Sequence, residues 1–230
     1  YDAYKIPAAV QQIVYSNRYL LEDGDEVFIR YNELIELKNR VWRKEKVSFS
    51  TIVSTMKPYG LRGDVFKDIT KYGLPPLSKN PIHGGYKVLG LEGAKRAFRF
   101  ISGDYPIPKT EMLDKYKIFV PRNWGEGDLS DVPANLYIAS PGELCTETFI
   151  QIGPFESKNE AENAYSYFKT KFFRALVGIR KQDQGASKSV YQFVPMQDFS
   201  KPWTDEELYK KYDLTEEEID FIESMIKPME

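Results

Sequence analysis

The middle of the chain consists of short apolar runs rich in β-branched and aromatic residues, with glycine or proline in the gaps between them. Runs of this length and composition are typical of strands joined by turns. Substantial loops, among them 71–85 and 122–133, separate the runs. We expect strands at 86–91, 96–101, 116–120, 136–139 and 146–152. The pattern therefore predicts a small mixed sheet that the rest of the chain must cover.

Helical periodicity flanks this sheet region on both sides. On the N-terminal side, apolar spacing predicts helices over 6–15, 27–42 and 49–56, the last capped by Ser48 or Ser50. On the C-terminal side it predicts one long helix from Ser157 to about Lys181, with Glu160 completing a capping box.

Beyond the long helix, 190–194 is a candidate strand. Thr204 and Thr215 each precede a short helix whose first turn carries acids, where the helix dipole favours them. The predicted fold class is α+β: N-terminal helices, a small mixed sheet with long loops in the middle, and a long helix plus short helices at the C-terminus.

A chain of 230 residues, 42% of them hydrophobic, can bury a substantial core. We divide it into a helical N-terminal segment (1–56), a mixed α/β recognition core (57–202) and an acidic helical tail (203–230), expected to pack as one compact domain. Because the first residue is Tyr1, we expect a piece of a longer protein. The single cysteine, Cys145, excludes an internal disulfide, and no apolar run approaches the ~20 residues of a membrane span. We expect a cytoplasmic protein that does not enter membranes.

The charge is distributed unevenly along the chain. Net charge is −2, but residues 203–230 hold ten acids and three bases, which leaves 24 acids and 29 bases in the remainder. A mildly basic body with an acidic tail is compatible with a nucleic-acid partner for the body.

Few residues could support catalysis. One histidine, His83, and one cysteine cannot form the common zinc sites. A pairing of Cys145 with His83 as nucleophile and base is formally possible, but a loop histidine and a buried thiol is the favoured interpretation. Glu36 and Lys38 have the Glu-x-Lys spacing of metal-dependent nucleases, with Asp23 and Asp25 upstream. An ordinary helix surface explains that triplet better.

Glycine-rich phosphate loops are also missing from the sequence. The stretch 90–93 lacks the third glycine of a dinucleotide-binding fingerprint. The stretch 73–77 contains a Pro-Pro pair without the polar and aromatic neighbours of an adenine methyltransferase loop. We therefore expect no catalytic residue, no metal site and no cofactor in this chain.

Three polar or aromatic segments remain as candidate binding sites. Arginine pairs with guanine edges, asparagine with adenine edges, and aromatic side chains contact bases or fill the gap left by an extruded one. A polar segment after the long helix suits phosphate contacts. The predicted DNA-binding residues are Lys57, Tyr59 and Arg62 on a first turn, Arg122, Asn123 and Trp124 on a second turn, and Arg180, Lys181, Gln184 and Lys188 after the helix.

Several motifs resemble the C-terminal target-recognition region of adenine-specific DNA methyltransferases from type II restriction–modification systems. They are densest from about residue 146 onward, although the resemblance runs over most of the chain. The motifs are Pro58–Arg62, Phe149–Phe155, Lys169–Arg174, Tyr191–Phe199 and Trp203–Tyr212.

The resemblance implies that this chain recognises double-stranded DNA. It also implies that an N-terminal catalytic domain of the parent protein binds S-adenosylmethionine and methylates adenine at N6. The catalytic Asn/Asp-Pro-Pro-Tyr motif and the glycine-rich cofactor motif are absent here, so activity is not expected of this chain itself. Two alternatives stay open: a restriction endonuclease-associated domain, and a protein-interaction module whose acidic tail docks on the catalytic domain.

Overall fold

The computed structural model describes residues 18–20, 26–28, 31–129, 131, 133, 136–181 and 183–229. Its strands form one two-stranded sheet, β1-β2, and two three-stranded sheets, ordered β4-β3-β7 and β6-β5-β8. The strands are β1 (Arg18–Leu20), β2 (Glu26–Phe28), β3 (Tyr86–Glu92), β4 (Lys95–Ile101), β5 (Tyr116–Pro121), β6 (Tyr137–Ala139), β7 (Glu143–Cys145) and β8 (Phe149–Phe155).

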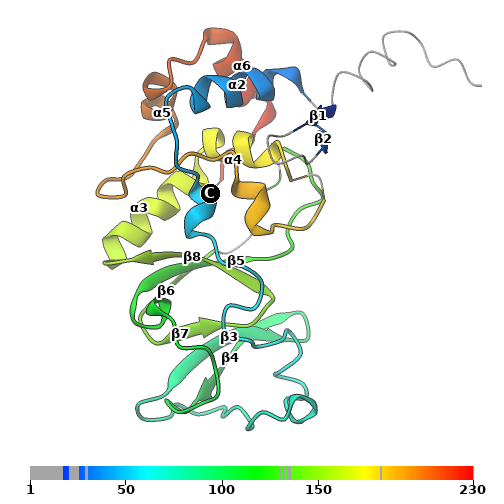
Figure 1. Cartoon of the computed structure of the whole chain (residues 1–230), viewed down its shortest axis with the longest axis vertical. Coiled ribbons are helices and arrows are strands. Elements are labelled where there is room, and N and C mark those ends of the chain that lie inside the picture. The colour runs from blue at the N-terminus through cyan, green and yellow to red at the C-terminus, as the bar shows by residue number, and fades with distance from the viewer. Residues whose placement is uncertain are drawn as a thin grey trace, which may run out of the picture.

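Helices accompany these sheets, which confirms the predicted α+β class. The α-helices are α2 (Asn32–Trp42), α3 (Lys158–Lys169), α4 (Lys171–Gly178), α5 (Asp205–Lys211) and α6 (Glu216–Met225). Single 3₁₀ turns are η1 (Phe49–Ile52), η2 (Thr70–Tyr72), η3 (Glu111–Asp114) and η4 (Lys188–Tyr191). Figure 1 shows three layers: helices at the top, the β6-β5-β8 sheet in the middle and the β4-β3-β7 sheet at the bottom.

The middle sheet separates two hydrophobic cores by the alternation of its side chains. Ile118 and Val120 of β5 belong to the larger core, which the helices cover. Phe119, between them, belongs to the smaller core, which the β4-β3-β7 sheet covers. Since successive strand residues point to opposite faces, one short apolar strand supplies both cores.

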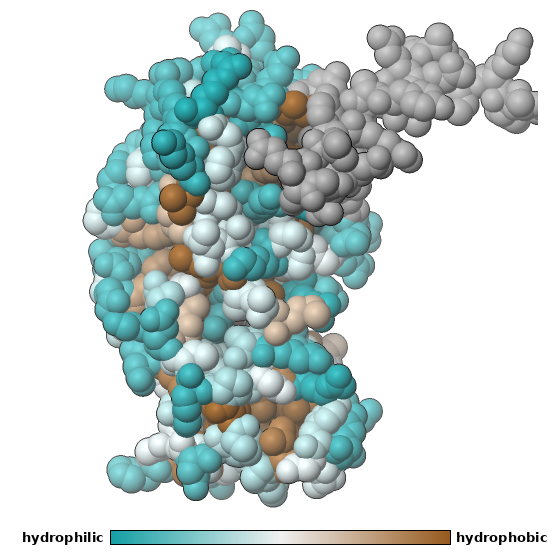
Figure 2. Space-filling model, in the orientation of Figure 1, coloured by the Kyte–Doolittle hydropathy of each residue, from teal (hydrophilic) through white to brown (hydrophobic). Residues whose placement is uncertain are grey.

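The lower sheet is the mixed one. Strand β3 pairs antiparallel with β4 from Tyr86↔Ile101 to Glu92↔Lys95, and parallel with β7. Figure 2 shows apolar side chains gathered over this lower layer, whereas the upper, helical end is mostly hydrophilic on the same face.

Four predicted strands are confirmed to within one residue as β3, β4, β5 and β6. The predicted strand 146–152 is wrong in its first half. Residues 146–148 form the connection between β7 and β8, where the Phe149 N–H donates back to the Thr146 carbonyl at 3.1 Å. The single sheet expected from the sequence is two sheets, because β5 pairs with β8 and β6 while β3 pairs with β4 and β7.

The predicted long helix is wrong as one element, because it breaks at Thr170. That residue has extended backbone angles (φ −61°, ψ 147°), and its hydroxyl accepts the Phe173 N–H at 3.1 Å. Thr170 thus ends α3 and caps α4. At the start of α3, Ser157 accepts the Glu160 N–H as predicted, but the Glu160 carboxylate accepts the N–H of Glu156 instead of completing a capping box.

The N-terminal predictions are only partly correct. The predicted helix 6–15 lies outside the described residues. Helix α2 begins at Asn32, later than predicted, and 26–28 is a strand. Of 49–56 only the turn η1 is helical, because Val53 and Ser54 then join the edge of β8; the Ser54 N–H donates to the Gln151 carbonyl at 2.8 Å.

The acidic tail packs into the larger core through Leu208, Tyr212 and Ile222. The two short helices predicted after Thr204 and Thr215 are confirmed as α5 and α6, and both threonines form complete capping boxes. The candidate strand 190–194 is wrong, since its first half belongs to the 3₁₀ turn η4. Figure 1 shows α6 beside α2, from the opposite end of the chain. Among the described residues, no helix is both long and apolar enough to cross a membrane.

Candidate nucleic-acid interface

An open cleft lies where the lower sheet meets the ends of β5 and β8. Its walls come from four parts of the chain: the first predicted turn, the tip of the β3–β4 hairpin, the second predicted turn and the β7–β8 connection. The lining residues are Gly63, Leu91, Ala94, Arg96, Pro121, Arg122, Asn123, Glu147, Thr148 and Phe149. The first turn therefore reaches this site through Gly63, which follows Arg62, and the second turn reaches it through Arg122 and Asn123.

Glu147 fixes the first turn against this cleft. One carboxylate oxygen accepts the Gly63 N–H at 3.0 Å, and the other lies 3.2 Å from Lys57 Nζ. The Glu147 N–H donates to the Leu61 carbonyl at 2.8 Å. Burial would raise the pKa of Glu147, but the Gly63 hydrogen bond and the Lys57 charge outweigh it and lower that pKa.

Backbone strain also occurs in the first turn. Lys57 has φ +57°, a left-handed conformation that costs a non-glycine residue about 1–3 kcal/mol. The Gly60 N–H closes the turn on the Lys57 carbonyl at 3.0 Å. The side chain of this strained lysine forms the ion pair with Glu147.

The second turn pairs with the polar segment that follows α4. The Trp124 N–H donates to the Gln184 carbonyl at 2.9 Å, and the Ala186 N–H donates to the Arg122 carbonyl at 2.7 Å. These bonds form an antiparallel bridge between Asn123 and Gly185. Two predicted segments far apart in the sequence therefore lie side by side, and the Asn123 and Gln184 side chains are both exposed.

A nest of backbone N–H groups shapes the loop after the second turn. One oxygen of Asp131 accepts the N–H groups of Glu126, Gly127 and Asp128 at 2.7, 2.7 and 2.8 Å. Gly125 has φ +61°, and a Cβ there would come within 2.2 Å of the Asp131 carboxylate. The loop that carries Arg122 and Asn123 is therefore fixed internally.

Three of the predicted DNA-binding side chains are buried, so this structure does not present them to a base. Tyr59 is 1% exposed, and its hydroxyl donates to Gln151 Oε1 at 2.8 Å. Trp124 is 8% exposed, with the Lys181 ammonium 4.0 Å from its ring centroid. Lys181 also donates to the Asp183 carbonyl at 2.9 Å. These aromatic rings and this lysine pack the turns from beneath, which corrects the contact role expected for them.

The other predicted residues lie at or near the surface. Lys57, Arg122 and Arg180 are half-buried, whereas Arg62, Asn123, Gln184 and Lys188 are exposed. The Arg62 guanidinium lies over the Tyr72 ring at 5.4 Å. Arg180 donates to Gln192 and lies over Phe193, on the helical side. Arg180 is thus placed apart from the cleft.

Sequence reasoning missed Arg96, which lines the cleft from the β3–β4 hairpin. Its guanidinium carbon lies over the Phe149 ring, 5.3 Å from the centroid, and desolvation lowers its pKa. The usable signal was a cluster of cations at the start of β4, namely Lys95, Arg96 and Arg99, on a strand otherwise treated only as part of the sheet.

The described residues do not bring the candidate catalytic side chains together into a site. The Cys145 thiol is fully buried, and burial raises its pKa well above the usual range, while His83 is exposed on a loop. Glu36 is exposed on α2, and Asp23 and Asp25 lie outside the described residues. Within the described residues, no group of three histidine, cysteine or acidic side chains could hold a metal ion.

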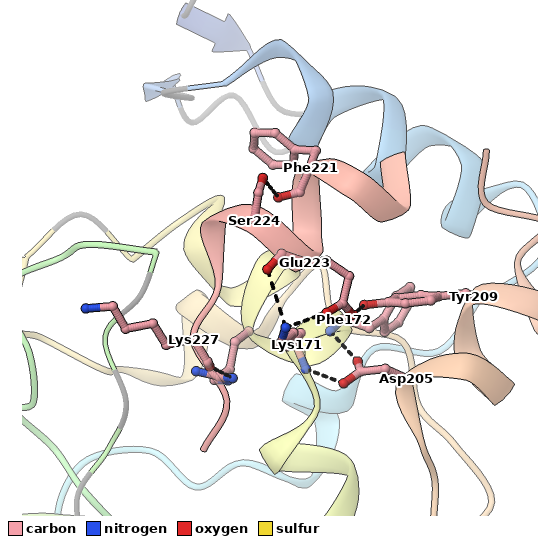
Figure 3. A network of polar contacts seen from close by, with 9 residues as sticks. Lys171, Phe172, Asp205, Tyr209, Phe221, Glu223, Ser224 and Lys227 are labelled. Carbon is pink, nitrogen blue, oxygen red and sulfur yellow. Dashed lines mark hydrogen bonds and ion pairs between the residues drawn. The ribbon is translucent and has the colours of Figure 1, made fainter. Parts of the chain in front are cut away.

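A second polar network joins two of the motifs that carry the family resemblance. Figure 3 shows the Asp205 carboxylate at the start of α4, accepting the Lys171 N–H at 3.0 Å and the Phe172 N–H at 2.8 Å. Glu223 of α6 accepts from Lys171 Nζ and from the Tyr209 hydroxyl. These contacts lie within the helical layer and stabilise the packing of α4, α5 and α6.

The motifs 169–174 and 203–212 thus have a structural role at the helical end, separate from the cleft. Comparison with known proteins adds no name: no family model matches this sequence, and no curated protein is significantly similar to it.

Proposed function

We propose that this chain binds double-stranded DNA in the cleft between its two turns, as the target-recognition part of an adenine-N6 DNA methyltransferase of a restriction–modification system. The observation that carries the proposal is that Arg122 and Asn123 of the second turn line one cleft with Gly63 of the first, while the third predicted segment pairs with the second turn. In that assignment the methyl donor, S-adenosylmethionine, is held by a catalytic domain of the parent protein, and this chain positions the duplex.

The charge around the cleft supports an anionic partner. Arg96 and Arg122 line it, Lys57 and Arg62 belong to the adjoining turn, and Glu147 is the single acid among the lining residues. Cations arranged along a groove bind phosphates and release counterions, so affinity falls as salt rises. Asn123 adds a side chain that can pair with an adenine edge.

Fluorescence anisotropy with labelled random duplexes tests the proposal at several salt concentrations. We expect measurable binding at low salt, with a negative slope of log affinity against log salt of roughly 0.9 per phosphate contacted. Arg122→Ala should weaken binding. Lys158→Ala is the matched control, because it removes an equal charge from an exposed residue beyond the opposite end of β8.

Selection of bound sequences from the random pool then tests recognition. Enrichment of a defined site supports the proposal. Absence of duplex binding at any salt, or equal weakening by the Arg122 and Lys158 variants, counts against it.

A further inference from the structure

The tip of the β3–β4 hairpin contributes Leu91, Ala94 and Arg96 to the lining of the cleft. Strands β3 and β4 stay paired up to Glu92↔Lys95, so only Gly93 and Ala94 form the turn, and Gly93 has φ +63°. Every residue from 92 to 96 is exposed. A two-stranded ribbon of this kind fits the major groove of B-DNA, which is about 12 Å wide.

Arg96 stands on the cleft side of this ribbon. It pairs across the hairpin with Leu91, and both residues line the cleft. Because side chains alternate along a strand, Lys95 points to the opposite face. The Phe149 ring beneath the Arg96 guanidinium restrains the side chain beside Arg122 and Asn123 of the facing turn.

We infer that the hairpin tip enters the major groove and that Arg96 contacts a base edge there, most naturally the O6 and N7 acceptors of guanine. The inference rests on the proposed function and adds a specificity-determining residue to it. Arginine forms two parallel hydrogen bonds with guanine in a fixed geometry, whereas a lysine ammonium reaches the same acceptors only as a flexible point charge. Lys57 and Arg62, on the adjoining turn, then contact phosphates, which position the duplex without recognising sequence.

The test is selection of bound duplexes by the full chain and three variants: Arg96→Ala, Arg96→Lys and Lys95→Ala. We expect Arg96→Ala to lose the preference at one base pair, with about a ten- to hundredfold loss of affinity for the preferred site, and Arg96→Lys to weaken that preference. Their affinity for unrelated duplexes should change much less. Lys95→Ala, with the same charge removed from the same hairpin, should keep the preference.

Two results would overturn the inference while leaving DNA recognition intact. One is an unchanged base preference in Arg96→Ala with weaker binding to every duplex and a shallower salt slope, which identifies a phosphate contact. The other is full retention of the preference in Arg96→Lys. Failure of the unmodified chain to bind any duplex would instead overturn the proposed function itself. Thermal melting checks folding, and Arg96→Lys decides the question if Arg96→Ala does not fold.

Discussion

Lys57 Nζ lies 3.2 Å from Glu147 Oε2, which ties the first turn to the β7–β8 connection. The lysine is held in a left-handed backbone conformation, and the same carboxylate accepts the Gly63 N–H. The position of the turn therefore depends on one acid from a distant part of the chain.

Two substitutions of Glu147 should distinguish the stabilisation by its Gly63 hydrogen bond from that by its Lys57 ion pair. Glutamine keeps an oxygen for the Gly63 N–H and loses the ion pair, which at this partial exposure contributes about 0–1 kcal/mol. Alanine also leaves the N–H without its acceptor, at a further cost of about 1–3 kcal/mol. Urea unfolding measures both free energies of unfolding, and equal losses for the two variants would contradict this arrangement.

The lowered pKa of the Glu147 carboxylate predicts that the free energy of unfolding depends on pH. Because folding lowers the pKa of Glu147, its ionised form stabilises the fold above the unfolded-state pKa. That contribution is lost as pH falls through the lowered pKa. The stability advantage of the unmodified chain over Glu147→Gln should shrink in acid, and a gap that stays constant from neutral pH to about pH 3 would disprove the assignment.

Gly125→Ala should destabilise the loop more than Gly73→Ala does. Both glycines have left-handed backbones, φ +61° and +66°, so each substitution carries a conformational cost of roughly 1–2 kcal/mol. Only at position 125 does the new methyl group displace the Asp131 carboxylate from the three backbone N–H groups that it accepts. Nothing lies within 4 Å of a Cβ at 73.

Urea unfolding of the two glycine variants gives this comparison directly. Asp131→Ala should lower the free energy of unfolding by about the difference between the losses of Gly125→Ala and Gly73→Ala. Equal effects of Gly125→Ala and Gly73→Ala would show that the Asp131 nest does not hold the loop.

The raised pKa of Asp205 predicts a pH dependence of the free energy of unfolding with the opposite sign. Desolvation raises its pKa, even though the Phe172 and Lys171 N–H groups act to lower it. A group whose pKa rises on folding stabilises the fold fully below its unfolded pKa, and this contribution is lost as pH rises through the folded value. The stability of the unmodified chain relative to Asp205→Asn should therefore decline from about pH 3 to neutral pH. A relative stability that rises with pH would contradict the raised pKa.

The acidic tail should prove indispensable for folding. Ile222 is fully buried in the larger core, and Ile222→Ala should cost about 2–5 kcal/mol of unfolding free energy. Asp220→Ala, at an exposed position of the same helix, is the control and should change stability little. Removing 203–230 uncovers the larger core, so we expect loss of cooperative unfolding. A truncated chain that still melts cooperatively would contradict this role.

Local patterns predicted some helix ends correctly and missed the break at Thr170. A threonine followed three residues later by glutamate supplies its own capping contacts. The helix starts at Thr204 and Thr215 were therefore predictable from the sequence. The apolar period, by contrast, runs through 157–181 without interruption. Besides the Thr170 hydroxyl, Asp205 supplies acceptors from far along the chain to the N–H groups at the start of α4.

The candidate site shows the same division between local and tertiary information. Turn composition selected Arg122, Asn123 and Trp124 together, but only packing decides that the tryptophan points inward and the asparagine outward. Arg96 was overlooked because a strand pattern does not say which of its cations faces a cleft.

The sequence by itself determined four of the strands, the helices that start after Thr204 and Thr215 and the α+β class, because alternation and first-turn charge depend on residues a few positions apart. Only the tertiary structure decided that the two turns meet at one cleft and that 184–186 pairs with 122–124. Those contacts are backbone hydrogen bonds and one carboxylate shared across distant segments. Almost any residue can make a backbone hydrogen bond, so side-chain identity leaves no local trace of such pairings.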